Sequence, residues 1–336
     1  MELRRRHRTL RVVGGWTTLV LGIAAIVLGA MRAEQQLAAI NFHAFDDWRT
    51  YANAVHRWLS GESIYAQIQV TGPYELRDSL LTGFTYPPAA VPLFLPFALG
   101  TAGLVGWITV NLGAFILGLV AVLRHELGTV EPLAFGVALL AAAAFPPFSN
   151  AVVSGNLNLG VAGMLAWLWV IRADRLTAAL AGLGAVLKIF PGLLAAWSLR
   201  RAGWLAFGVA AGTALVVIVL TLPMVGAASW IDFGLSLRNA QPECSAQSVS
   251  IACLLDGPLS PAAARLVGIV VSLILVAVVI RARSEFVAYA ALAGALLAPV
   301  VDMHPHYWLI VWVVAFVGVA RVAGRRRRRR LAVASA

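Results

Sequence analysis

Charged residues are scarce in this chain: 12% of its 336 residues are Asp, Glu, Lys or Arg, whereas 60% are hydrophobic. A soluble globular protein has roughly 25% charged residues. This shortfall excludes an ordinary soluble enzyme, a disordered chain and a nucleic-acid-binding domain. Together with the mean hydropathy of +0.84, it predicts a chain that lies largely within a membrane.

Acidic residues are too few to balance the basic ones, and the net charge is +11. The excess is confined to two tails: five arginines lie within residues 1–11 and six within residues 324–336. Without these arginines, 15 basic residues face 15 acidic ones. Basic tails beside apolar segments are typical of the cytoplasmic side of a membrane protein. We therefore expect two basic cytoplasmic tails and no nucleic-acid partner.

Several short signatures are also missing. The chain contains no HExxH, CxxC, Walker or GxGxxG motif and no internal repeat, and we expect no cofactor. Only two cysteines are present, Cys244 and Cys253. Because both fall in one predicted outer loop, they could form a disulfide or remain two thiols.

Apolar runs of about 20 residues predict membrane helices. Eight full crossings are expected, over residues 12–31, 104–123, 132–148, 157–171, 203–223, 262–280, 286–301 and 307–322. Two shorter runs are expected to enter the membrane partway: 88–99 as a short helix and 176–199 as a pair of half-helices, with tilted full crossings as the alternative. The predicted fold is one all-α polytopic membrane domain over residues 1–336, with about 8–11 transmembrane or half-membrane helices.

Arginines orient these helices, because arginine-rich loops stay on the cytoplasmic side. This orientation places loops 32–86 and 224–260 on the extracytoplasmic side. The first loop contains an amphipathic stretch that is suited to lie at the membrane interface. Most polar residues that could carry chemistry fall on this outer side.

Two adjacent carboxylates, Asp46 and Asp47, lie in the first outer loop, just before the amphipathic stretch. A carboxylate held beside apolar surface can act as a general base. Either aspartate could instead cap the N-terminus of a helix that begins there. Both interpretations remain open at this point.

Lys188 is the only lysine in the chain, and it interrupts an apolar run three residues before Pro191. An ammonium at a turn between two half-helices is suited to bind a phosphate. A lone lysine in such a run could also extend toward lipid headgroups. We favour phosphate binding.

Other polar residues on the outer side are candidates for substrate contact: Tyr86, Asn156, Asn158, Arg238, Gln247, His304 and His306. The two asparagines could bond a sugar hydroxyl or cap the next helix. Asp302 and the two histidines could ligate a metal, but they lie within five residues and a proline separates them. We therefore favour substrate positioning or proton handling.

The order of these segments resembles glycosyltransferase family 87, the polyprenol-phosphate-mannose-dependent α-1,2-mannosyltransferase-like proteins of the GT-C superfamily. The resemblance covers roughly residues 16–322 and rests on Asp47 to Tyr51, Leu59 to Tyr65, Tyr86-Pro87-Pro88, Gly155 to Asn158, Lys188 to Pro191, Gln247-Ser248 and His306-Tyr307. Asn156 stands where the family usually has glutamine.

The resemblance implies a GT-C-like helical bundle that uses a lipid-linked monosaccharide on the extracytoplasmic side, usually with inversion. It implies Asp47 as the catalytic base, with Asp46 as the adjacent competitor. It also implies Lys188 near the donor phosphate, where we add Arg238. Substrate contacts are assigned to Tyr51, Tyr86, Asn156, Asn158, Gln247, His304 and His306.

The expected function is transfer of a hexose, above all mannose, from a polyprenyl-phosphate donor to a hydroxyl of a glycan or glycolipid of the cell envelope. The expected location is the plasma membrane, and the expected partners are this donor, this acceptor and membrane lipids. Arabinofuranosyl or glucosyl transfer from the same class of donor is one alternative. A transporter or flippase for lipid-linked sugars is another, although no inverted repeat supports it.

Overall fold

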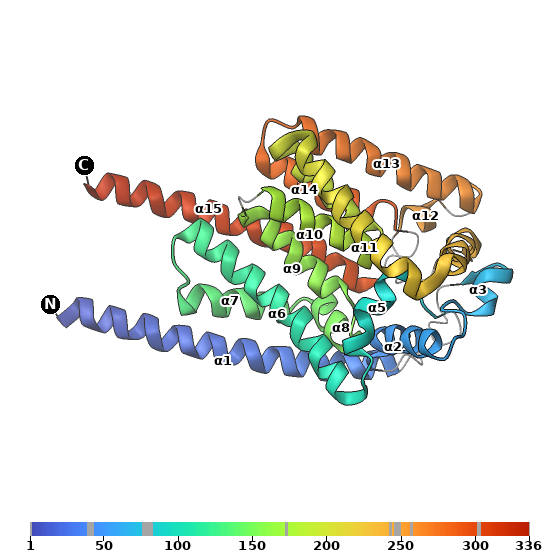
Figure 1. Cartoon of the computed structure of the whole chain (residues 1–336). Coiled ribbons are helices and arrows are strands. Elements are labelled where there is room, and N and C mark those ends of the chain that lie inside the picture. Colours follow the sequence, from blue (N-terminus) through green and yellow to red (C-terminus); the bar gives the residue numbers. More distant parts are fainter. Residues whose placement is uncertain are drawn as a thin grey trace. The chain divides into compact units, whose positions relative to one another are not determined.

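A computed structural model describes residues 2–38, 44–75, 83–171, 174–241, 244, 250–255, 258–300 and 304–335 (Figure 1). The α-helices are α1 (Glu2–Ala38), α2 (Asp46–Leu59), α3 (Gln67–Thr71), α5 (Val91–Phe94), α6 (Gly100–Leu127), α7 (Pro132–Ala143), α8 (Pro146–Ser154), α9 (Asn158–Val170), α10 (Asp174–Leu187), α11 (Ala195–Asn239), α12 (Ile251–Leu254), α13 (Pro261–Arg281), α14 (Glu285–Leu297) and α15 (Leu309–Ser335). Short 3₁₀ helices are η1 (Pro88–Ala90), η2 (Leu95–Phe97), η3 (Phe190–Leu194) and η4 (Pro305–Trp308). The strands β1 (Tyr74–Glu75) and β2 (Ala240–Gln241) pair in parallel.

Five helices of the described chain are long and apolar enough to cross a membrane. They are Val13–Gln36, Gly100–Leu127, Phe190–Asn239, Pro261–Arg281 and Pro305–Val333. The pair α7 and α8 forms a sixth candidate if it counts as one bent span, and shorter apolar helices accompany these. The prediction of an all-α polytopic membrane protein is confirmed.

The crossing predicted over residues 132–148 is not one straight helix. Helix α7 ends at Ala143, α8 begins at Pro146, and the two are bent by 76°. Proline has no backbone N–H, and its ring clashes with the preceding helical turn. Pro146 therefore starts a new helix, a position that proline favours.

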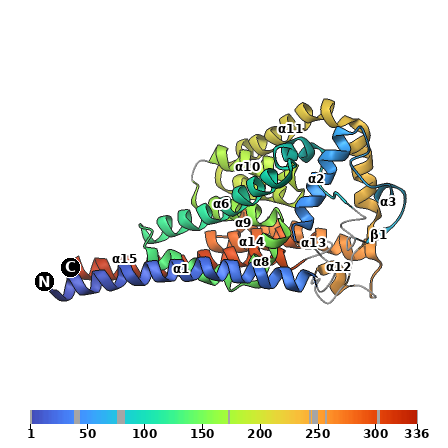
Figure 2. The same ribbon diagram turned by 90° about the horizontal axis from the view of Figure 1, so that it is seen from below.

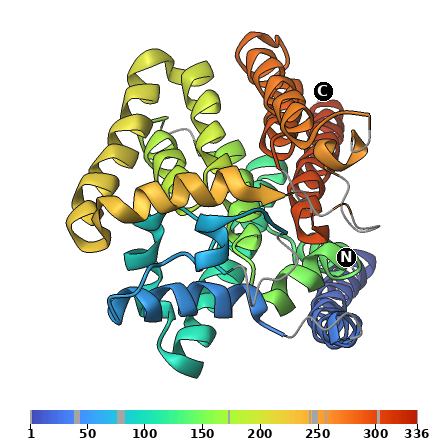
Figure 3. The same cartoon turned by 90° about the vertical axis from the view of Figure 1, so that its right-hand side faces the viewer.

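Helix α11 consists of three segments, because Gly203 (φ 72°, ψ −164°) and Gly226 (φ 76°, ψ 155°) leave helical geometry. Its change of direction is visible in Figure 3. The first segment continues η3 and matches the second predicted half-helix. The last segment extends to Asn239, inside the predicted loop 224–260, and it buries Phe233 and Ser236 on one face. This spacing of three residues is helical.

The chain divides into two compact units. The first comprises residues 1–44, 110–170 and 308–336. Within it, α1 lies along α7 and α8 (Figure 2). The backbones of α6 and α9 approach closely at Gly163, where an added Cβ would lie 2.6 Å from the carbonyl of Ala114. Small residues at such contacts are typical of membrane helix packing.

The second unit comprises residues 45–109 and 171–307. Within it, α10 packs on α11 and α13 on α14. Helix α2 lies against α5 and η2, where the Trp48 indole donates a hydrogen bond of 2.8 Å to the carbonyl oxygen of Phe97. Cys244 and Cys253 form a disulfide. This unit contains most of the candidate site residues.

Gly203 provides a test of the first break in α11. Its φ and ψ angles are essentially accessible only to glycine, and imposing them on another residue costs about 1–3 kcal/mol. We expect Gly203→Ala to lower the unfolding temperature of the detergent-solubilised protein. In the control Gly208→Ala, the methyl group has no atom within 4 Å and the backbone is helical. If Gly208→Ala unfolds at as low a temperature as Gly203→Ala, the conformation at Gly203 does not specifically require glycine.

Candidate active site

Both aspartates lie in the first turn of α2. The N-cap residue is Phe45, with φ of 65° and no side-chain cap bond, so neither aspartate is the cap residue. Asp46 is buried, and its Oδ1 accepts a hydrogen bond of 3.1 Å from Arg49 Nη1. Asp47 is only partly buried. Asp46 is thus tied to its own helix, whereas Asp47 acts on residues of other segments, as described below.

Tyr51, one turn after Asp47, anchors an aromatic cluster. Its hydroxyl lies 2.8 Å from that of Tyr86, and its ring stacks on Phe94 at 4.8 Å between centroids. The carbonyl oxygen of Tyr86 accepts a hydrogen bond of 2.6 Å from the Tyr65 hydroxyl. Pro87 and Pro88 follow directly, and they fix an extended entry into η1. Tyr86 is therefore held from three directions.

Lys188 lies in the break between α10 and η3, outside every described segment that is long enough to span a membrane. Its Nζ lies near three aromatic rings. The distances to the ring centroids are 5.2 Å for Tyr86, 5.1 Å for Phe190 and 4.7 Å for Tyr307. A cation within about 6 Å of a ring centroid is attracted by the ring's negative face. The aromatic cluster therefore forms the walls of a cation site.

Charges of distant segments meet here. Burial lowers the pKa of the Lys188 ammonium from 10.5 to about 7, and the carboxylate of Asp47 opposes this shift. The pKa of Tyr86 lies well above its usual value because of burial, then the neighbouring Tyr51, then the charge of Asp47. Asp47 therefore acts electrostatically on both Lys188 and Tyr86. A carboxylate, an ammonium and a phenol share one site.

His306 and His304 extend this site. The His306 ring stacks on Tyr307 at 5.0 Å and lies 5.5 Å from the His304 ring. His306 is buried and His304 is partly exposed. Asp302 lies outside the described residues. Within the described part of the chain, no group of three or more His, Cys, Asp or Glu residues is arranged to hold a metal ion.

Of the four remaining predicted site residues, the structure describes Asn156, Asn158 and Arg238. Asn156 and Asn158 are buried in the other unit, where the Asn156 Oδ1 accepts a hydrogen bond of 2.8 Å from the backbone N–H of Asn158. This bond supports the capping interpretation. Arg238 is exposed in the last turn of α11, and it makes no contact with the cluster in the described chain. Gln247 lies outside the described residues.

Sequence analysis missed two walls of the lysine site, Phe190 and Tyr307. Both are aromatic neighbours of residues that it selected, since Phe190 follows Lys188 by two positions and Tyr307 follows His306. Their ring centroids lie 5.7 Å apart. Aromatic residues close in sequence to the only lysine and to His306 were the signal that could have identified them.

The hydrogen bond between Tyr51 and Tyr86 is testable by a double-mutant cycle. Tyr51→Phe and Tyr86→Phe each remove one hydroxyl and keep the ring. Because the hydroxyls are buried partners, we expect a coupling of about 0.5–1.5 kcal/mol in the free energy of unfolding. Denaturant titration of the four proteins in micelles measures it. Strictly additive single effects would show that the two hydroxyls do not interact.

Comparison with known proteins agrees with this architecture. The family model described as glycosyltransferase family 87 matches residues 84–336, a segment that includes Tyr86, Lys188 and His306. The two aspartates precede the matched segment. Neither a curated protein nor a solved structure gives a match. Because the match covers most of a chain rich in membrane helices, the protein belongs to glycosyltransferase family 87 and is a membrane glycosyltransferase.

Proposed function

We propose that this glycosyltransferase moves a hexose, above all mannose, from a polyprenyl-phosphate donor to a hydroxyl of a glycan or glycolipid. The observation that carries the proposal is the position of the Lys188 Nζ among the rings of Tyr86, Phe190 and Tyr307. The charge of Asp47 favours the ammonium form of this lysine. Sugar transfer from a phosphate needs a base for the acceptor hydroxyl and a cation for the departing phosphate. The two groups come from different sequence segments of the second unit, residues 45–109 and 171–307.

In the proposed reaction, the acceptor oxygen attacks the anomeric carbon of the donor sugar. The bond between that carbon and the phosphate oxygen breaks, and polyprenyl phosphate leaves. Asp47 takes the proton of the acceptor hydroxyl, and Lys188 stabilises the negative charge on the phosphate. A single displacement from the side opposite the leaving group inverts the anomeric centre.

The aromatic walls fit the donor sugar. Rings at Tyr86 and Tyr307 present flat apolar faces, and His306 adds a nitrogen that can bond a hydroxyl. Tyr51 holds Tyr86 through its hydroxyl. We therefore assign Tyr51, Tyr86, His304 and His306 to shaping the sugar site. Contributions of Arg238, Gln247, Asn156 and Asn158 remain predictions.

We further propose that the site faces away from the cytoplasm, at the plasma membrane. The disulfide between Cys244 and Cys253 belongs to the same unit as Lys188. Disulfides persist in oxidising compartments and are rare in the cytosol. The arginine-rich ends of the chain favour the same orientation, because such segments stay on the cytoplasmic side.

Replacing the proposed base tests the reaction. Asp47→Asn keeps the shape of the side chain and removes its basicity, so we expect kcat to fall by about 10²–10⁴-fold. The assay follows radiolabelled mannose from polyprenyl-phosphate mannose to an acceptor. The matched variant Asp46→Asn should keep most of the activity. If only Asp46→Asn loses activity, the catalytic base is Asp46 and not Asp47.

The charge on Lys188 predicts a pH dependence. Since its pKa is lowered to about 7, the ammonium is lost as pH rises above that value. We expect the Kd for the donor to be flat below pH 7 and to rise by up to about tenfold per pH unit above it.

Lys188→Arg is the control for this titration, because a guanidinium remains charged throughout the range. Its donor affinity should stay nearly constant from pH 6 to about 9. Scintillation proximity binding with labelled donor measures both proteins. The same rise in Kd for Lys188→Arg would show that another group titrates.

A further inference from the structure

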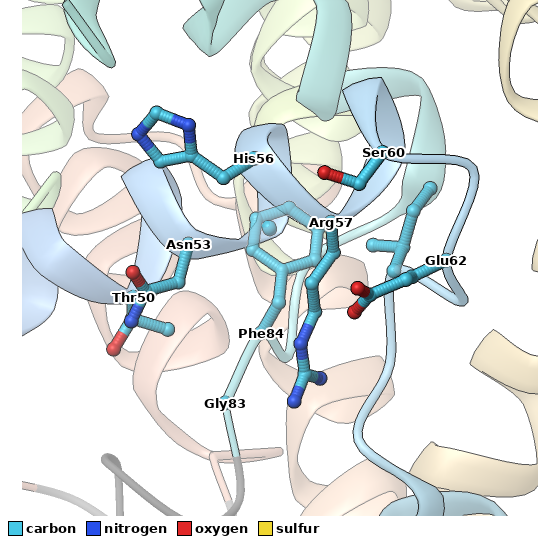
Figure 4. A pocket seen from close by; sticks show the side chains of 10 residues that line it. Thr50, Asn53, His56, Arg57, Ser60, Glu62, Gly83 and Phe84 are labelled. Atoms are coloured by element: carbon cyan, nitrogen blue, oxygen red, sulfur yellow. The ribbon is translucent and has the colours of Figure 1, made fainter.

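A cavity of about 230 Å³ opens beside α2, and the proposed reaction leaves it unused (Figure 4). Most of its wall is polar, with side chains of Thr50, Asn53, His56, Arg57, Ser60 and Glu62. In the view of Figure 4, the Arg57 side chain lies between those of Asn53 and Glu62. Thr50, Asn53 and Arg57 share one face of α2, whereas Ser60 and Glu62 follow the end of that helix. Asp47 and Tyr51 lie on the adjacent face.

Most polar side chains of this wall make no hydrogen bond within the described part of the chain. Thr50 donates its hydroxyl hydrogen to the backbone oxygen of Asp46 at 3.0 Å. The side chains of the other five polar residues make no hydrogen bond or ion pair with any residue that the structure describes. These residues are exposed or partly exposed, so water satisfies them. A ligand that enters can replace that water without breaking a bond within the protein.

We propose that this cavity binds a neutral sugar ring of the acceptor, an inference that rests on the proposed glycosyl transfer. The wall carries one cation, Arg57, and one anion, Glu62, so it offers no net attraction to a phosphate. A sugar hydroxyl both donates and accepts hydrogen bonds. It is therefore matched by a wall that holds a guanidinium, a carboxylate, an amide and a hydroxyl.

The size of the cavity narrows the ligand further. Pockets for drug-sized molecules begin at roughly 300 Å³, above the 230 Å³ found here. The cavity thus has the size of one small ring. If a glycan places one sugar ring in the cavity, its next sugar would lie along α2.

The cavity adjoins the proposed reaction centre. Thr50 at its edge follows Asp47 by three positions, and residues at this spacing lie about 5–6 Å apart between Cβ atoms. On the opposite wall, the Phe84 ring lies 5.4 Å from the Tyr86 ring between centroids. A sugar seated in the cavity would therefore lie within about one helical turn of Asp47. The cavity would select the acceptor, while the lysine site binds the donor.

Direct binding tests the inference without requiring turnover. Methyl α-mannoside, methyl α-glucoside and methyl α-galactoside are titrated into the full-length protein in nanodiscs, with saturation-transfer NMR as the readout. We expect at least one of them to bind, and inorganic phosphate should not displace it. Absence of binding by all three probes, or displacement by phosphate, would overturn the inference.

Variants locate the binding. Arg57→Ala and Glu62→Gln should each weaken it by about tenfold, the loss of one charge-assisted hydrogen bond. The control Gln67→Ala removes an exposed polar side chain on neighbouring α3, outside the cavity, and it should bind the probe as the wild type does. Unchanged affinity in both cavity variants, or equal loss in the control, would contradict the site.

Turnover separates this inference from the proposed function. With a labelled donor, Glu62→Gln should raise the KM for the acceptor by about tenfold and leave kcat nearly unchanged. If both cavity variants transfer sugar with an unaltered KM for the acceptor, the cavity does not bind the acceptor, and the proposed transfer reaction still stands. If the protein binds the probe at Arg57 and Glu62 but transfers no sugar, the cavity is a sugar-binding site and the proposed transfer reaction is wrong.

Discussion

The interaction on which the site depends is that of a single ammonium, Lys188, with the carboxylate of Asp47. Removing a charge from water is costly unless an opposite charge or hydrogen-bonding groups compensate for it. Three aromatic rings surround the ammonium and contribute a weaker attraction. Asp47 supplies the opposite charge, which favours the charged form of Lys188. The phosphate of the proposed donor would offset this cost further.

Breaks in the helices create this arrangement. Lys188 is free to point into the cluster because α10 ends at Leu187 and η3 begins at Phe190. Tyr86 stands just before two prolines that prevent a helix from starting earlier. Irregular backbone is tolerated within a membrane protein where other parts of the protein surround it. The helix breaks therefore lie at Lys188 and Tyr86, two residues of the candidate site.

Much of this could be read from the sequence, since apolar runs and arginines are local signals. The runs predicted the helical membrane fold, and the solitary Lys188 close to Pro191 indicated the break between α10 and η3. Three features were not predicted: the bend at Pro146, the helix that continues to Asn239, and the rings of Phe190 and Tyr307 around the lysine. The bend at Pro146 has a local cause, the proline itself. The other two features depend on which distant segments pack together, and residue order alone does not specify that. For Asn156, the sequence left a helix cap and a substrate contact open, and the observed hydrogen bond supports the cap.

Because Lys188 is the only lysine in the chain, ¹⁵N-lysine labelling gives one side-chain Nζ resonance, and its pH titration in nanodiscs tests the central claim most directly. In the wild type, we predict an ammonium pKa far below that of free lysine, and Asp47→Asn should lower it further because the stabilising charge is gone. Asp46→Asn should leave it nearly unchanged. A titration near the ordinary lysine value, or one that ignores Asp47→Asn, would contradict the account.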